Sequence, residues 1–131
     1  MRNISDPPII LYSLGNFSKL NNLPSVGIIG TRHPSSLGIS SAKRFGEIFG
    51  EKDFNVVSGL AIGCDASAHR GCLDKCGFTT AVLAHGLDVV YPKENTAIAD
   101  EIIKSGGVLI SEYSVGQSSR PNYFIERDRI Q

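Results

Sequence analysis

The stretch VGIIGTRHPSSLG, residues 26–38, contains the pattern that decides the fold. Its first five residues form a continuous apolar run after a proline, which is typical of a buried strand in a parallel sheet. Gly30 and Gly38 then bound a turn of the kind that lets backbone N–H groups approach an anion. The tip of the turn carries Arg32 and His33, where dinucleotide-binding loops keep small residues. The stretch therefore predicts a nucleotide-type α/β fold with an unusual cation in its first turn.

Outward from this stretch, apolar runs alternate with segments of helical periodicity. Strands are predicted at 26–30, 55–59, 79–84 and 108–113, and helices at 38–52, 65–77, 94–107 and 123–131. Such alternation implies right-handed crossovers and a parallel sheet covered on both faces. The prediction is a Rossmann-like three-layer α/β/α fold with a mostly parallel sheet of at least four strands.

Two of these helices carry more specific expectations. The helix at 65–77 is expected to begin with Asp65 as its N-cap and to end with Gly77 as its C′ residue. The helix at 38–52 is expected to bury an apolar face that consists of Ile39, Ala42, Phe45, Ile48 and Phe49.

The chain divides into a lead-in and one domain. Residues 1–25 are polar and interrupted by prolines, with a possible short extended segment at residues 7–16. Residues 26–131 are expected to form a partial domain or one with an unusually small sheet, because the chain stops within a predicted helix and an open α/β sheet normally continues with another strand. No internal repeat or low-complexity tract is present.

Charge, hydrophobicity and cysteine content argue against several classes of protein. Thirteen basic and thirteen acidic residues cancel, which argues against a protein that coats long duplex DNA with a general basic surface. No apolar run is long enough for a membrane span, and the N-terminus is a poor signal peptide. Three cysteines cannot all pair with one another, which suits a reducing compartment. We expect a cytoplasmic protein without membrane contact.

The known phosphate-binding fingerprints do not fit the loops that follow the strands. The first turn lacks G-x-G-x-x-G, the second strand ends without an acidic residue, and no P-loop or nucleophile elbow occurs. An anion-binding rim rich in glycine remains, with Arg32 in it. Arg32 suits bidentate contact with a phosphate, although solvation or pairing with a local carboxylate is an open alternative. Glu112, at the end of the fourth predicted strand, is expected to fix the position of the Arg32 or Arg120 side chain.

Catalytic and metal-binding alternatives have simpler explanations. Asp65 and His69 lie four residues apart and could form an acid–base pair, but a helix cap and a local hydrogen bond are the favoured interpretation. Three cysteines and two histidines do not have metal-ligand spacing, so we expect no metal. Tyr91 is expected to shape the turn before the third helix and not to serve as a stacking platform.

Five ordered motifs resemble those of the DNA-processing protein A family, also called DprA or Smf. They are VGIIGTRHPSSLG, VVSGLAIGCDASAHRGCL, TTAVLAHGLDVVYPKEN, GGVLISEYSVG and RPNYFIERDRI. The resemblance implies single-stranded DNA binding, protection of incoming DNA and loading of RecA in natural transformation and recombination. It implies no catalysis and no cofactor. It also implies a homodimer whose interface belongs to the later half of the family's domain, beyond Gln131.

The resemblance also implies which residues contact DNA. Arginines would bind phosphates, and Phe124 would offer a stacking surface to an unpaired base. The implied nucleic-acid-binding residues are Gly30, Thr31, Arg32, Ser58, Gly59, Leu60, Gly63, Asp65, Arg120, Asn122, Phe124, Arg127 and Arg129.

The chain departs from the family pattern at several of these positions. Asn122 and Tyr123 stand where the family has a Gly-Asn pair, and Asp128 stands between two arginines where the family has an asparagine. An acid at that place is expected to weaken DNA binding if it faces the pocket. Two other functions fit the same pattern: a sensor of a small nucleotide-derived ligand, and a fragment without activity.

Overall fold

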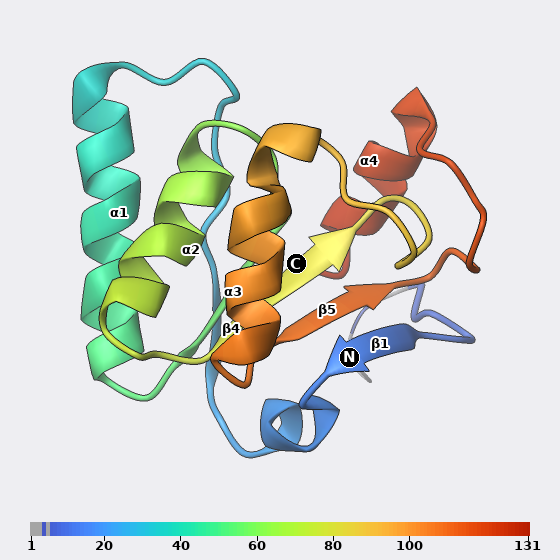
Figure 1. The fold of residues 1–131 in the computed structure, drawn as a ribbon, viewed down its shortest axis with the longest axis horizontal. Helices are drawn as coiled ribbons and strands as arrows, with labels where there is room; N and C mark the ends of the chain where they lie inside the picture. Colours follow the sequence, from blue (N-terminus) through green and yellow to red (C-terminus); the bar gives the residue numbers. More distant parts are fainter. Residues whose placement is uncertain (1–3, 5) are drawn as a thin grey trace.

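The computed structural model describes Ile4 and residues 6–131, which form a five-stranded sheet in the order β1-β5-β4-β3-β2 (Figure 1). The strands β2 to β5 run parallel, and β1 is antiparallel to its neighbour β5. The predicted Rossmann-like, mostly parallel sheet is therefore confirmed. The strands are β1 (Tyr12–Gly15), β2 (Ser25–Gly27), β3 (Asn55–Ser58), β4 (Thr79–Leu83) and β5 (Val108–Ser111).

The two edge strands differ from what the sequence predicted. The expected extended segment contains β1, which joins the sheet with Gly15 opposite Val108. The strand β2 is shorter than the predicted 26–30. Beyond it, the N–H of Ile28 donates to the carbonyl of Val57 at 2.9 Å. The backbone leaves the sheet early because it enters the turn that carries Arg32.

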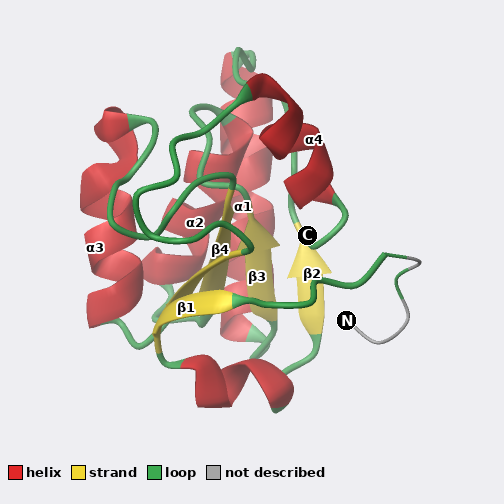
Figure 2. Cartoon of the chain, turned by 90° about the vertical axis from the view of Figure 1, so that its right-hand side faces the viewer, coloured by secondary structure: helices red, strands yellow, loops and turns green. Residues whose placement is uncertain are grey.

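Three helices cover one face of the sheet, and the other face is covered differently (Figure 2). The helices α1 (Ser36–Glu51), α2 (Cys64–Asp74) and α3 (Thr96–Lys104) lie on the first face, and a short 3-10 helix, η2 (Lys93–Asn95), leads into α3. The 3-10 helix η1 (Phe17–Asn21) and α4 (Pro121–Asp128) lie on the opposite side. No helix in residue 4 and residues 6–131 is long and apolar enough to cross a membrane.

Each face of the sheet has its own apolar core, because successive side chains of a strand point to opposite faces. Towards the helices, Ala81 and Leu83 of β4 pack with Ile102 of α3. On the opposite face, Val82 of β4 packs with residues from the two ends of the chain, including Leu20 and Ile130. The termini therefore supply the cover that helices supply on the first face.

Helices α1 and α2 approach each other through glycines, which corrects the predicted apolar face of α1. A Cβ at Gly46 would collide with the Ala68 carbonyl, and one at Gly71 would collide with the Lys43 carbonyl. The buried stripe of α1 is Ala42, Gly46 and Gly50. Ile39 and Phe45, which were expected inside, are 46% and 53% exposed. Hydrophobic periodicity failed here because backbone contact, not side-chain volume, joins the two helices.

The ends of α2 also differ from the prediction. Asp65 lies inside the helix, which has Gly63 as its N-cap and no capping side chain. The left-handed residue after the helix is Cys76, with φ 54°, and not Gly77. The carboxylate of Asp65 is thereby free to bond elsewhere.

Candidate functional site

Four loops meet at the edge where the parallel strands end (Figure 1): residues 28–35, 59–63, 84–92 and 112–120. We call these loops and the first turn of α4 the rim. Hydrogen bonds connect neighbouring loops, from Cys64 N–H to the Thr31 carbonyl at 3.2 Å and from Gly86 N–H to the Gln117 carbonyl at 2.8 Å. The first loop is therefore held to the start of α2 beside the second loop, and the third loop is held to the fourth, at the carboxyl end of the sheet where open α/β folds bind ligands.

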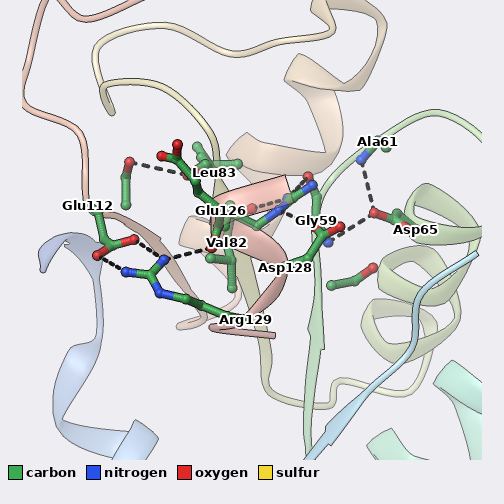
Figure 3. Close-up of polar contacts among 12 residues, drawn as sticks. Gly59, Ala61, Asp65, Val82, Leu83, Glu112, Glu126, Asp128 and Arg129 are labelled. Atoms are coloured by element: carbon green, nitrogen blue, oxygen red, sulfur yellow. Dashed lines mark hydrogen bonds and ion pairs between the residues drawn. The ribbon is translucent and has the colours of Figure 1, made fainter. Parts of the chain in front are cut away.

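Asp65 connects two of these loops from beneath. Its buried carboxylate accepts hydrogen bonds from Gly30 N–H at 3.4 Å, Gly59 N–H at 3.0 Å and Ala61 N–H at 3.4 Å, the last two drawn in Figure 3. Burial raises the pKa of Asp65 above its usual range, and these N–H groups oppose the rise. The predicted capping role is wrong, because the carboxylate serves the neighbouring loops and not the start of its own helix.

Two further predicted residues, Ser58 and Leu60, have buried side chains. The hydroxyl of Ser58 donates to the carbonyl of Ile28 at 2.7 Å, which holds the first turn beside β3. Leu60 belongs to the core beneath the three helices. The structure therefore places both side chains inside the protein and brings only the adjacent backbone to the rim.

Gly63 has a conformation that other residues rarely adopt. Its φ is +88°, and a Cβ there would lie 2.5 Å from the Thr31 carbonyl. Gly30 faces Cys64 with similar closeness, since its Cβ would lie 2.6 Å from the Cβ of Cys64. The first and second turns are thus in backbone contact, which positions Thr31 and Arg32 at the outer edge.

Arg32 lies over an aromatic ring at the outside of the rim. Its guanidinium carbon is 4.9 Å from the ring centroid of Phe124, a cation–π geometry. Phe124 in turn contacts Tyr91, with centroids 6.1 Å apart at 53°. Within residues 4 and 6–131, Arg32 forms no ion pair, so pairing with a local carboxylate does not account for it. These three side chains line a small pocket of about 60 Å³ together with Gly59, Ala61, Ile62 and Pro92.

Arg127 lies inside the protein. Its Nη1 donates to the carbonyl oxygens of Gly59, at 2.9 Å, and Val82, and its Nε donates to Asp128 Oδ1 at 3.0 Å. Burial lowers the pKa of Arg127, and the carboxylates of Asp128 and Asp65 oppose this. With a side chain only 6% exposed, Arg127 holds α4 against β3 and β4.

Arg129 is occupied by acidic partners. It forms a bidentate pair with Glu112, in which both N–O distances are 2.6 Å (Figure 3), and a further ion pair with Asp6 at 3.2 Å. The hydrogen bond to Glu112 raises the pKa of Arg129. The expectation that Glu112 orders Arg32 or Arg120 is therefore wrong.

Arg120 and Asn122 are exposed at the start of α4. Arg120 lies 5.8 Å from the ring centroid of Tyr123, and Asn122 donates to Glu126 at 3.0 Å. Tyr123 stacks on Tyr113, with centroids 4.2 Å apart and planes at 22°. Of the four predicted arginines, two are therefore exposed beside aromatic rings and two are compensated by acids.

The sequence interpretation missed two aromatic residues of the rim, Tyr91 and Tyr123. Tyr91, expected only to shape a turn, is half-exposed beside Phe124. Tyr91 lies in the loop after β4, and Tyr123 lies in the first turn of α4, next to the predicted Asn122 and Phe124; these positions were the available signal. Their pairing with Phe124 and Tyr113 depends on α4 folding back over the rim.

His69 does not pair with Asp65. Its Nδ1 lies 2.7 Å from the hydroxyl of Thr79, which itself donates to the carbonyl of Val56, so Nδ1 carries the proton. Burial lowers the pKa of His69 to about 3. In the part of the chain that the structure describes, no three His, Cys, Asp or Glu side chains come together as metal ligands.

A sequence model of the DNA recombination-mediator protein A family matches residues 1–131 of the chain. The chain belongs to the DprA/Smf family. It is 39% identical to Protein Smf of Synechocystis sp. over 130 residues, and 32% identical to the DNA processing protein DprA of Bacillus subtilis. These matches cover 97% and 99% of the chain.

Solved DprA structures have the same fold as the chain. The Helicobacter pylori protein, described for its single-stranded DNA binding mode, superposes with a TM-score of 0.88 at 30% identity. The Streptococcus pneumoniae protein superposes with a TM-score of 0.86 at 36% identity. Both matches cover 97% of the chain, and they cover 57% and 44% of the two solved chains. The chain spans 32% and 43% of the length of the Synechocystis and Bacillus relatives.

Proposed function

We propose that the chain binds single-stranded DNA across the rim, with Arg32 and Phe124 as its main contacts. The observation that carries this proposal is the exposed Arg32 over the ring of Phe124, without a carboxylate partner among the described residues. A guanidinium supplies a phosphate contact, and an adjacent ring supplies a face for an unpaired base. The family membership and the DNA binding mode described for the H. pylori relative support it.

A single strand suits this surface better than a duplex. The bases of a duplex are stacked on one another and unavailable to Phe124, whereas the bases of a single strand are accessible to it. The chain has no net charge, and two of the four predicted arginines, Arg127 and Arg129, are paired with acids. Binding to long duplex DNA depends on many phosphate contacts, which this surface does not offer.

The size of the pocket argues against the small-ligand sensor. Sites that enclose a small ligand usually measure roughly 300–1,000 Å³, and the pocket beside Arg32 and Phe124 measures about 60 Å³. A nucleotide would lie against this pocket and not inside it. A strand, which gains affinity from several shallow contacts in series, fits such a surface.

We infer from the family that the bound strand is protected and passed to RecA in natural transformation and recombination, and that the chain acts by binding and not by catalysis. A homodimer is the inferred state of the whole protein. The cytoplasm is the inferred compartment, where its three free cysteines stay reduced. A strand-exchange assay on single strands coated with a single-strand binding protein tests the RecA role, and the length of the recovered DNA tests the absence of cleavage.

The central experiment measures the anisotropy of a labelled oligothymidylate. Arg32→Ala should weaken binding roughly ten-fold, the usual loss for one charge-assisted contact. Arg44→Ala is the matched control, because Arg44 is exposed on α1 outside the rim and pairs with Glu47 at 3.4 Å. Equal isotherms for Arg32→Ala and the wild type would overturn the proposal. Strong thermal stabilisation by a mononucleotide, without stabilisation by the oligonucleotide, would favour the sensor.

A further inference from the structure

We propose that Tyr123 and Arg120 form a second nucleotide subsite, one step along the strand from Arg32 and Phe124. The proposal rests on the single-stranded DNA binding proposed above and adds a subsite to it. It assigns a binding role to Tyr123, which departs from the family pattern and which the sequence interpretation left without a function.

The second subsite repeats the construction of the first. In the first, Arg32 lies 4.9 Å from the ring of Phe124, and the ring of Tyr91 lies 6.1 Å from it. In the second, Arg120 lies 5.8 Å from the ring of Tyr123, and Tyr113 stacks on that ring at 4.2 Å. Each subsite thus combines one exposed arginine, one ring of the first turn of α4 and one supporting tyrosine.

The ring of Tyr123 is held in place from several directions. Its hydroxyl accepts a hydrogen bond from Gln117 Nε2 at 3.0 Å. The supporting Tyr113 is buried, and its hydroxyl donates to Glu126 at 3.0 Å. A ring fixed in this way loses little conformational entropy when a base stacks on it. Less of the favourable stacking free energy is therefore offset, and binding is tighter.

Arg120 is the movable part of the subsite. It is exposed and forms no ion pair with any residue among 4 and 6–131. The guanidinium carbon of Arg120 lies 5.8 Å from the ring centroid of Tyr123, at the far limit of a cation–π contact. When a strand binds, Arg120 moves from the ring to the neighbouring phosphate, and a base takes its place on the ring.

Tyr123 and Phe124 are consecutive residues, so the two rings lie on adjacent sides of one helical turn. In the proposed complex, a strand that crosses this turn presents successive bases to the two rings. Stacking accepts every base, so this subsite adds affinity without sequence preference.

Tryptophan fluorescence tests the subsite directly, because the chain contains no tryptophan. Tyr123→Trp and Phe124→Trp place a reporter at the second and first rings. Phe45→Trp is the control, at an exposed aromatic residue of α1 outside the rim. Oligothymidylate should quench the emission of both rim variants, since a stacked base quenches indole, and leave the control unchanged.

Affinity gives the second readout. Tyr123→Leu should weaken oligothymidylate binding roughly five-fold or more, whereas Tyr123→Phe should retain it, because the ring and not the hydroxyl stacks on the base. Quenching of Phe124→Trp without quenching of Tyr123→Trp would overturn the second subsite and leave the proposed function standing. Absence of oligonucleotide binding by the wild-type chain would overturn both. A thermal unfolding curve for each variant identifies losses that come from misfolding.

Discussion

The site has an inner layer beneath the rim and an outer layer on the rim, and arginine has a different role in each. In the inner layer, Arg127 and Asp65 are buried and bond to the backbone of loops that must be held together. In the outer layer, Arg32 and Arg120 are exposed and rest on aromatic rings. The difference teaches that an arginine in a family motif has two possible roles, and that burial and partners decide between them. The following predictions test this separation.

The largest expected effect is on the stability of the inner layer. Arg127→Met should lower the free energy of unfolding by about 3 kcal/mol, because the carbonyls of Gly59 and Val82 lose a buried donor. Arg32→Met should change it by no more than about 0.5 kcal/mol. Urea unfolding measures the free energy of unfolding of both variants. Equal values would contradict the distinction between the layers.

The pH dependence of stability should also come from buried groups. His69 has a folded-state pKa of about 3 and an unfolded value near 6.5, so the unfolded chain binds the proton more tightly. The contribution of neutral His69 to the free energy of unfolding is therefore fully present above pH 6.5. It is lost as the pH falls towards 3, by at most about 1.4 kcal/mol per pH unit.

The control for this effect is His69→Gln, which should flatten the acid limb of a plot of unfolding free energy against pH. Asp65 acts in the opposite direction near its own titration, because its pKa is raised. The comparison with His69→Gln separates the two contributions. An unchanged acid limb would contradict the assignment to His69.

A smaller effect concerns the salt dependence of DNA binding. Single-strand binding has a slope of about −0.7 in log K against log salt for each phosphate neutralised, so two unpaired arginines predict a slope of about −1.4. Arg32→Ala should reduce it by about 0.7. Arg129→Ala should leave it unchanged, because Glu112 and Asp6 already compensate that charge. A wild-type slope steeper than about −3 would mean that Arg127 and Arg129 also contact phosphates.

The smallest expected effect is that of Asp128→Asn. The amide oxygen can still accept the hydrogen bond that Arg127 Nε donates at 3.0 Å, so the fold should be retained. Removal of one exposed negative charge near the rim should raise oligonucleotide affinity about two-fold at low salt. Fluorescence titration at two salt concentrations checks it, and a loss of affinity would show that the carboxylate itself supports binding.

Sequence periodicity predicted the parallel strands well and the helix surfaces less well. Strands such as β4 are buried on both faces and therefore read as continuous apolar runs. The contact between α1 and α2 depends on Gly46 and Gly71, which contribute no hydrophobic signal. Asp65 looked like a helix cap because its type and position fit one, although its carboxylate bonds to other loops.

The sequence by itself determined the alternation of strands and helices, the order of the rim segments and the identity of the family, because these depend on local patterning and on residues adjacent in the chain. Only the tertiary structure decided which arginines are exposed. The buried carbonyls of Gly59 and Val82 and the carboxylate of Glu112 belong to segments distant in sequence from α4. An arginine surrounded by such acceptors is retained inside, and one without them stays at the surface, where a ligand can reach it.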